Sequence, residues 1–248
     1  MFRNERKNEI LKILSAREYV TVAELSKLLY TSESSIRRDL VELEQETLVI
    51  RSYGGVELAK SNARSVPFAL RLHSRIREKK QMAEKAASLV GEKDIVFLDQ
   101  SSSALFLAQE LFRNRKVTIV TNNLEILCAE QPAGVTVYST GGRVSGYRRC
   151  LIGENATEVF SNMRADFAFF SSKALSSEGI IYDNSLEEVK VKEAMIKNAA
   201  KTVFLCDSEK FDKYAGYKQC DLNAVDYLIS EGQIPEKFRQ LSPNTQFL

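Results

Sequence analysis

Between residues 95 and 229 the chain alternates short apolar runs with helical patterns, and this alternation limits its fold more than any other feature. The runs have the length of strands, and they are Ile95–Leu98, Val117–Val120, Val135–Tyr138, Phe167–Phe170, Thr202–Cys206 and Tyr227–Ile229. The helical patterns lie near 103–113, 122–130, 154–162 and 186–200. Strands that alternate with helices pack as a largely parallel sheet with right-handed crossovers. We therefore predict an α/β domain over residues 78–248, which opens with a helix at about 78–90.

The first 58 residues follow a different plan, with three short helices before a hairpin. Residues 10–14 place one apolar stripe on a first helix. Thr21 opens a second helix with the capping-box pattern S/T-x-x-E, and Ser32 is suited to cap a third. Residues 48–56 read as two strands around a tight turn. Helix, turn, helix and hairpin are the plan of a winged helix-turn-helix, which we predict for residues 1–58.

The third helix has the polar surface that such a domain places in the major groove. There Arg reads guanine, and Ser reaches a base edge or a phosphate. The candidate DNA-contacting residues are Thr21, Ser32, Ser34, Ser35, Arg37, Arg38, Arg51 and Tyr53. The alternative is a packing module with a solvated Arg pair. That alternative is favoured by the near-neutral charge of residues 1–58, which hold nine Arg and Lys against ten Asp and Glu.

Composition excludes several other classes of protein. With 248 residues, 44% of them hydrophobic and 27% charged, the chain is long and apolar enough for one large or two modest folded domains. The single histidine, His73, lies in a charged stretch and reads as a surface residue, which leaves no multi-histidine metal site. The four cysteines form no C-x-x-C pair and read as reduced thiols. We expect no metal and no cofactor.

A basic linker is predicted between the two domains, at residues 59–77. Residues 59–80 hold seven Arg and Lys against one Glu, a band that suits a phosphate backbone or simply a solvated linker. The longest apolar run, Ala104–Ala108, is far shorter than a membrane span, and the first residues contain no apolar signal segment. We therefore expect a cytoplasmic protein that does not enter the membrane.

Residues 3–58 resemble the DNA-binding domain of the DeoR family of bacterial transcription regulators. The resemblance is carried by the runs at 20–25, 32–40 and 48–56, above all by Arg-Arg-Asp-Leu at 37–40 and the wing Arg-x-x-Gly-Gly at 51–55. Thr47 stands where the family usually has Gly at the end of the third helix, and a β-branched residue is poorly suited to the left-handed conformation of a helix C-cap. Tyr53 stands where the family usually has His.

The resemblance continues through the second domain and spans about residues 3–230 in all. It follows Pro67-Phe68, Arg71 and Glu78-Lys79, and then the segments 98–103, 121–123, 140–142 and 206–211. It implies the effector domain of the family, which is related in fold to sugar-phosphate isomerases and CoA transferases. The usual ligands of that domain are phosphorylated sugars or related metabolites. The resemblance thus implies a transcription regulator and not an enzyme.

Polar residues follow the predicted strands, and we expect them to form an effector site at one edge of the sheet. Hydroxyls and helix-terminal N–H groups suit a phosphate, and a Lys adds a point charge. The candidates are Asp99, Ser101, Ser102, Ser103, Thr121, Asn122, Asn123, Gly141, Gly142, Arg143, Asp207 and Lys210. Taken singly, each also reads as an ordinary turn, cap or surface charge. Ser101, where the family has Gly, and Ser171-Ser172, where it has Gly and a small residue, alter what the ligand meets.

These observations predict a homo-oligomeric repressor, a dimer or a tetramer, that binds operator DNA and is modulated by a phosphorylated sugar. Two alternatives stay open. One is an isomerase-like enzyme that uses Asp99, Asp207 and Lys210 beside a vestigial helix-turn-helix. The other is a DNA-binding protein whose second domain only oligomerises.

Overall fold

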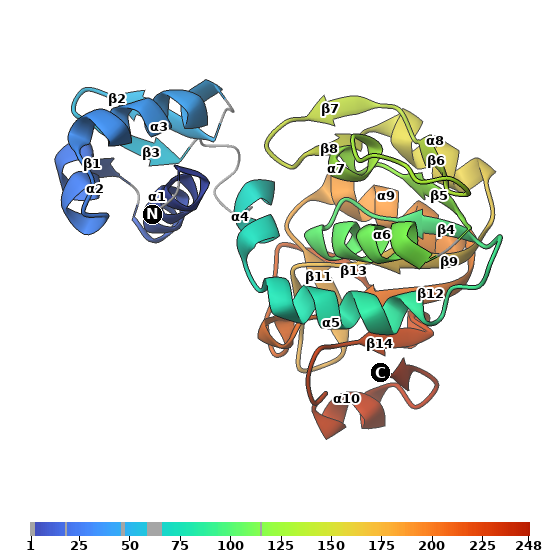
Figure 1. Ribbon diagram of the computed structural model, residues 1–248. Coiled ribbons are helices and arrows are strands. Elements are labelled where there is room, and N and C mark those ends of the chain that lie inside the picture. The colour runs from blue at the N-terminus through green and yellow to red at the C-terminus, as the bar shows by residue number, and fades with distance from the viewer. Residues whose placement is uncertain (1–2, 18, 46–47, 59–65, 115) are drawn as a thin grey trace. The chain divides into compact units, whose positions relative to one another are not determined.

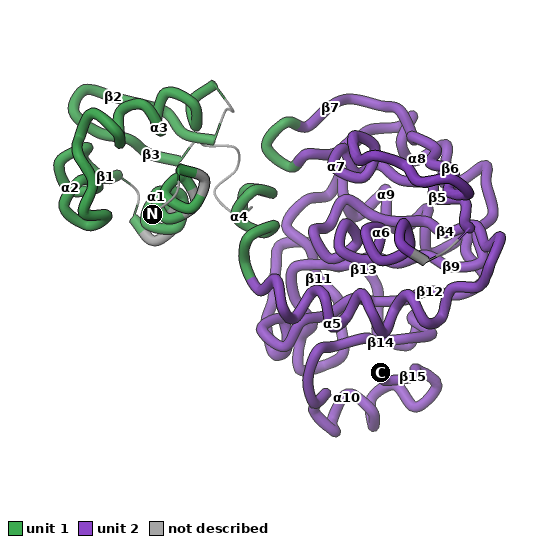
Figure 2. Tube along the Cα trace, viewed as in Figure 1, with its two compact units in different colours: residues 1–74, 146–148 green, residues 75–145, 149–248 purple. Residues whose placement is uncertain are grey.

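The computed structural model describes residues 3–17, 19–45, 48–58, 66–114 and 116–248 (Figure 1). The chain divides into two compact units, which Figure 2 colours separately. Unit 1 comprises residues 1–74 and 146–148, and unit 2 comprises residues 75–145 and 149–248. Thr47, for which the sequence predicts a strained helix end, lies outside the described residues.

Unit 1 is a winged helix-turn-helix, as predicted. Its helices are α1 (Arg3–Ala16), α2 (Val22–Leu28) and α3 (Glu33–Gln45). Its antiparallel sheet has the order β1-β3-β2, with β1 (Val20–Thr21), β2 (Val49–Ser52) and β3 (Gly55–Leu58). Ile10, Leu25, Ile36, Leu43 and Val56 are completely buried in its core. The sequence did not predict the short strand β1, because two residues are too few to show a period.

An ion-pair cluster joins α1 to α3 and accounts for the near-neutral charge of this unit. The buried carboxylate of Asp39 accepts hydrogen bonds from Arg6 Nε at 2.5 Å and Arg6 Nη2 at 3.2 Å. Glu42, one turn further along, pairs with Arg3 and Lys7. Acidic residues on this face of α3 therefore balance basic residues of α1, so the net charge of the unit says little about its other faces.

Helix α4 (Phe68–His73) changes the extent of the predicted linker. Phe68 and Leu70 are buried, and Leu70 is part of the apolar core of unit 1. The boundary between the two units falls between Ser74 and Arg75, and α5 (Ile76–Ala87) begins directly after it. Residues 66–77 are therefore largely helical, while 59–65 lie outside the described residues. His73 is exposed at the end of α4, in agreement with its interpretation as a surface residue.

Unit 2 contains a seven-stranded sheet in which every neighbouring pair is parallel, as the sequence predicts. Its order is β15-β14-β12-β9-β4-β5-β6. The strands are β4 (Ile95–Leu98), β5 (Thr118–Thr121), β6 (Thr136–Ser139), β9 (Ala165–Phe170), β12 (Ala199–Leu205), β14 (Tyr227–Ile229) and β15 (Gln246–Phe247). The first six in chain order match the predicted runs. The chain moves outward from β4 through β5 to β6, then returns to the other side of β4 with β9.

Helices cover both faces of this sheet (Figure 1). They are α5, α6 (Ser102–Asn114), α7 (Leu124–Leu127), α8 (Glu154–Asn162) and α9 (Leu186–Lys197). On one face, Phe97 and Ala168 of the sheet pack with Phe160 of α8 and with Val191 and Met195 of α9. Helices α5 and α6 pack against each other on the opposite face.

Several short elements surround the sheet and were not predicted. The hairpin pairs β7 (Arg143–Ser145) with β8 (Cys150–Ile152). A second antiparallel sheet joins β10 (Ala174–Leu175), β11 (Ile180–Asp183) and β13 (Tyr217–Asp221). The remaining elements are two 3₁₀ turns, Ser208–Lys210 and Leu222–Ala224, and α10 (Glu236–Leu241). Elements of two to six residues carry too little hydrophobic pattern to be distinguished from loops.

Candidate functional site

The exposed face of α3 carries the residues that the sequence assigns to DNA. Ser34, Arg37 and Arg38 are exposed, and Ser35 is half-buried. Arg37 pairs with Glu33 one turn earlier at 3.1 Å, and Arg38 Nε donates to the Ser34 carbonyl at 3.4 Å. An exposed ion pair like that of Arg37 contributes roughly 0.3–0.5 kcal/mol. The Arg38 hydrogen bond is long, so either guanidinium group can turn toward a phosphate or a base edge at little cost in free energy.

Two of the predicted DNA residues form the caps of this motif. Thr21 and Glu24 make a complete capping box, in which the Thr21 hydroxyl accepts from Glu24 N at 3.2 Å and Thr21 N donates to the Glu24 carboxylate at 2.8 Å. Ser32, just before α3, accepts from Ser35 N at 3.4 Å through its hydroxyl. Both hydroxyls therefore fix where a helix begins, a structural role that stands beside the predicted DNA contact.

The wing is held in place by a residue that the sequence reasoning missed. Tyr19 donates its hydroxyl to the Tyr53 carbonyl at 3.2 Å, and a Cβ at position 55 would lie 2.3 Å from the Tyr19 ring, so only glycine fits there. Gly54 adopts a φ of +82° at the tip, and the Tyr53 side chain is fully exposed. Arg51 pairs with Glu44 of α3 at 2.6 Å. The wing thus presents an unpacked tyrosine beside a paired arginine.

Most of the predicted effector residues of unit 2 meet at the carboxyl edge of the parallel sheet, where the strand order reverses between β4 and β9. This switch point is where open α/β sheets bind ligands. Asp99 follows β4, and its carboxylate accepts from Ser101 N and from Ser171 N, which follows β9, each at 3.0 Å. The completely buried Asp99 therefore joins the loops after two neighbouring strands. Burial raises its pKa above the ordinary value, although Lys192 and the N–H donors oppose the shift.

The serines after Asp99 form the start of α6. Ser101 caps this helix by accepting from Ala104 N at 3.0 Å, and it occupies the place of the family glycine without positive φ. Ser102 and Ser103 lie in the first turn, where backbone N–H groups have no partner within the helix. Both side chains are buried at the sheet edge. The arrangement suits an anion.

The segment Thr121-Asn122-Asn123 after β5 joins the same cluster. The Thr121 hydroxyl donates to the Leu98 carbonyl at 2.7 Å. Asn123 Nδ2 donates to the Ser101 carbonyl at 3.1 Å, and its Oδ1 caps α7 through Glu125 N. Thr121 and Asn123 therefore brace the loop after β4. Asn122 has a free acceptor, considered below.

Lys192 of α9 is the central residue that the sequence reasoning missed. Its ammonium donates to the Ser171 carbonyl at 2.9 Å, to the Ser172 hydroxyl at 3.1 Å and to Asp183. These three bonds use all of its donors. Burial opposes its charge, but Asp183, Asp99 and Glu188 outweigh that effect and hold the pKa of Lys192 above its ordinary value. The sequence contains one sign of this role, because Lys192 interrupts the apolar stripe of its helix, three residues from both Val189 and Met195.

Lys210 is a cation of the cluster with one ammonium hydrogen that is not used by the described residues. It lies in the 3₁₀ turn after β12, where it donates to the Ser171 hydroxyl at 2.6 Å and pairs with Asp207 at 3.1 Å. Burial raises the pKa of Asp207, but Lys210 and Arg75 outweigh it and hold the pKa below the ordinary value. Arg75, at 3.7 Å from Asp207, also pairs with Glu231.

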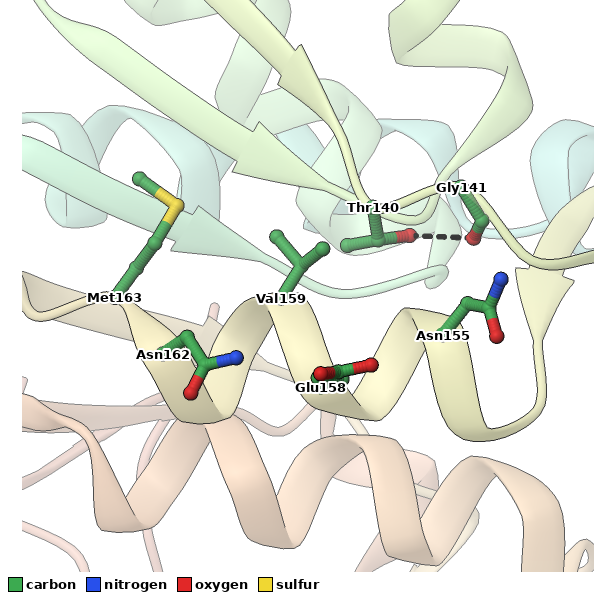
Figure 3. Close-up of a pocket in the computed structure, with 7 residues that line it drawn as sticks. All are labelled: Thr140, Gly141, Asn155, Glu158, Val159, Asn162 and Met163. Carbon is green, nitrogen blue, oxygen red and sulfur yellow. Dashed lines mark hydrogen bonds between the residues drawn. The ribbon is translucent and has the colours of Figure 1, made fainter.

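Three predicted residues lie after β6, outside the buried cluster. Gly141 and Gly142 adopt φ of +64° and +109°, and a Cβ on Gly142 would lie 2.7 Å from the Ile152 carbonyl. Arg143 is exposed and pairs with Glu187 at 2.6 Å. A hollow of about 500 Å³ opens beside this turn, against α8 (Figure 3). Of the predicted effector residues it includes Gly141 alone, whereas the polar side chains converge at the buried cluster.

Other chemistries find no support in the part of the chain that is described. No group of three or more His, Cys, Asp or Glu within it is arranged to hold a metal ion. All four cysteines are free thiols, and burial raises the pKa of Cys220 to about 12. Among the described helices, none is long and apolar enough to cross a membrane.

A winged helix-turn-helix followed by a parallel α/β domain is the architecture of a transcription regulator with a separate sensor domain. Residues 6–62 match the DeoR-like helix-turn-helix domain, and residues 74–232 match the DeoR C terminal sensor domain. The chain belongs to the DeoR family, a family of transcription regulators and not of enzymes.

Comparison with individual proteins agrees with this assignment. The chain is 33% identical over 236 residues to the HTH-type transcriptional regulator GolR of Listeria innocua, and the aligned region covers 94% of this chain and 92% of that protein. It is 27% identical over 244 residues to the glycerol-3-phosphate regulon repressor of Escherichia coli, which covers 97% and 96%. Among solved structures, ribose 5-phosphate isomerase A of Methanocaldococcus jannaschii is 15% identical, with a TM-score of 0.42 over 56% of this chain and 55% of that one.

The buried charge of Lys192 gives a prediction about stability. Lys192→Met leaves Asp183 buried without its cation, and we expect a loss of about 3–5 kcal/mol in the free energy of unfolding. The double variant Lys192→Met with Asp183→Asn should lose less than the single one. Urea denaturation followed by circular dichroism measures both. Lys190→Met, at an exposed position of the same helix, is the control, and a Lys192→Met variant as stable as this control would contradict the prediction.

Proposed function

We propose that the protein is a cytoplasmic repressor that binds operator DNA through α3 and the wing and is modulated by a phosphorylated sugar or a related phosphorylated metabolite. The DNA contacts are proposed for Ser34, Ser35, Arg37 and Arg38, with Arg51 and Tyr53 against the backbone. Family membership supports DNA binding, and the exposed, weakly paired guanidinium groups support these particular contacts.

The observation that carries the effector proposal is the convergence of Lys210 and the start of α6 at the switch point of the sheet. The N–H groups of Ser102 and Ser103 and the free donor of Lys210 supply positive potential for a phosphate. Asp99 and Asn122 supply acceptors for hydroxyl groups. One end of the cluster thus suits an anion and the other a polyol, and one relative is named for the regulon of such a compound, glycerol 3-phosphate.

Control of DNA affinity then follows from linkage. An effector changes that affinity only by the difference between its own affinities for the DNA-binding and the released arrangement of the protein. The alternative, a second domain that only oligomerises, is tested by the calorimetric ligand titrations described below.

The DNA contacts are tested by truncating each arginine. Arg37→Ala or Arg38→Ala should weaken binding to an operator selected from random duplexes by about 1–3 kcal/mol where the lost contact is to a base. Gel-shift titration measures the affinity. Arg113→Ala, an exposed arginine of unit 2, is the matched control and should bind as wild type does. Wild-type affinity in both α3 variants would refute this placement.

A homo-oligomer is proposed because one recognition helix reads few base pairs, while a symmetric dimer reads two half-sites. Unit 2 is the proposed contact: its edge strand β6 exposes Tyr138, and the neighbouring hairpin exposes Val144. Multi-angle light scattering at micromolar protein should give two or four times the protomer mass of 28.0 kDa. A single species at the protomer mass would count against it.

Lys210 provides the test of the effector site. Lys210→Ala should raise the Kd of a sugar phosphate roughly 10- to 100-fold, because a charge-assisted hydrogen bond is lost, while binding of DNA alone stays unchanged. Calorimetric titration with ribose 5-phosphate, glucose 6-phosphate, fructose 1-phosphate and glycerol 3-phosphate measures this. Lys201→Ala, an exposed lysine of β12, is the control. Equal affinities in Lys210→Ala and wild type would place the effector elsewhere.

Asp99 is less suitable for the same test. Both of its oxygens accept backbone N–H groups, so Asp99→Asn turns an amide nitrogen toward one of these donors. We expect Asp99→Asn to disturb sugar selectivity, and a loss of stability would accompany that effect.

A further inference from the structure

One buried acceptor in the polar cluster has no donor among the residues that the structure describes. Asn122, at the carboxyl end of β5, is completely buried, and its Oδ1 makes no hydrogen bond. An unpaired buried acceptor costs about 1–3 kcal/mol, so such atoms are rare in folded proteins. The two hydrogens of its Nδ2 are both used, toward the Leu151 carbonyl at 3.0 Å and Gln100 Oε1 at 3.1 Å.

The orientation of this amide is fixed by its neighbours. A carbonyl can only accept, so Leu151 requires the nitrogen of Asn122 on its side. Gln100 is fixed in the same way, because its Nε2 donates at 2.9 Å to an oxygen of Glu188. The negative charge of Glu188 is one of those that raise the pKa of Lys192. The chain of bonds therefore runs in one direction, from Asn122 through Gln100 to Glu188. Reversing either amide would place two acceptors together, so Oδ1 of Asn122 stays the open acceptor.

Asn122 lies beside the groups that suit a phosphate. Its neighbour Asn123 bonds the carbonyls of Asp99 and Ser101, which lead into the first turn of α6. A ligand whose phosphate lies at that turn therefore brings its carbon chain close to the loop that holds Asn122. A ligand can satisfy Oδ1 only with a group that donates a hydrogen bond and carries no negative charge, since Glu188 and Asp99 are near. A sugar hydroxyl meets both conditions.

We propose that Asn122 is a specificity-determining residue that requires one donating hydroxyl on the effector, and that Gln100 and Glu188 are positioning residues that hold it. This rests on the proposed effector site and deepens it. The effector class becomes polyhydroxylated phosphates, and phosphorylated compounds without a hydroxyl at that place are rejected. A site built to bond a hydroxyl discriminates strongly against analogues that lack it, because its own polar group is then left unpaired.

The experiment is a thermodynamic cycle in which both the protein and the ligand are changed. Wild type, Asn122→Ala, Gln100→Met and Gln219→Met are titrated by calorimetry with the four phosphates named above and inorganic phosphate. Each sugar phosphate that binds is then compared with its monodeoxy and deoxyfluoro analogues. In wild type, one deoxy position should raise Kd about 5- to 100-fold, and the fluoro analogue at that position should lose as much, because fluorine cannot donate.

The variants show which residue causes the loss of affinity for the deoxy analogue. In Asn122→Ala the penalty at that one position should disappear, while penalties at other positions remain, and Gln100→Met should reduce it. Gln219→Met is the matched control, because Gln219 is a second buried glutamine with an unpaired Oε1 outside this relay, and it should keep the wild-type pattern. The affinity for inorganic phosphate should be the same in all four proteins.

The outcomes separate this proposal from the one it rests on. If wild type binds none of the phosphates, the effector site itself is refuted. If wild type binds a sugar phosphate but the deoxy penalty is the same in Asn122→Ala, or the fluoro analogue binds like the parent sugar, the site stands and the role of Asn122 is refuted. A change of selectivity in Gln219→Met as large as in Gln100→Met would refute the role of the relay.

Discussion

Parallel pairing of the central strands is the constraint on which the rest of unit 2 depends. Because β4, β5, β9 and β12 all run the same way, the loops that follow them meet at one edge. The reversal of strand order between β4 and β9 opens that edge at the position of Asp99. Backbone N–H groups from both loops converge on its carboxylate, so Asp99 joins the two loops.

The charges at this edge are balanced by partners that come from far along the chain. Lys192 lies on α9 and Lys210 in the turn after β12, and both contact Ser171. All three ammonium hydrogens of Lys192 bond to groups of the protein, whereas Lys210 bonds to two such groups. The two lysines on the same serine therefore differ in the donors that they leave unused. They also differ in burial, because Lys192 is buried and Lys210 is half-buried.

The sequence predicts the helix-turn-helix, the parallel sheet and most of the polar edge, because these depend on local periodicity and on where strands end. It does not predict Lys192 or Asp183, since their pairing depends on how α9 packs on the sheet and on an antiparallel sheet of very short strands. Gln100 was within a recognised motif, yet its partner Glu188 is 88 residues away. Tyr19 was missed for a similar reason, because its role depends on how closely Gly55 of the wing approaches it.

The run Arg37-Arg38-Asp39 combines two kinds of residue within three positions. The arginines point to solvent, whereas Asp39 points inward and is held by Arg6 of α1. A screen that scores only loss of repression will therefore report Asp39 and Arg6 as strongly as the arginines, although neither faces the surface assigned to DNA. Abundance measured alongside repression will divide these positions into those that build the helix and those that use it.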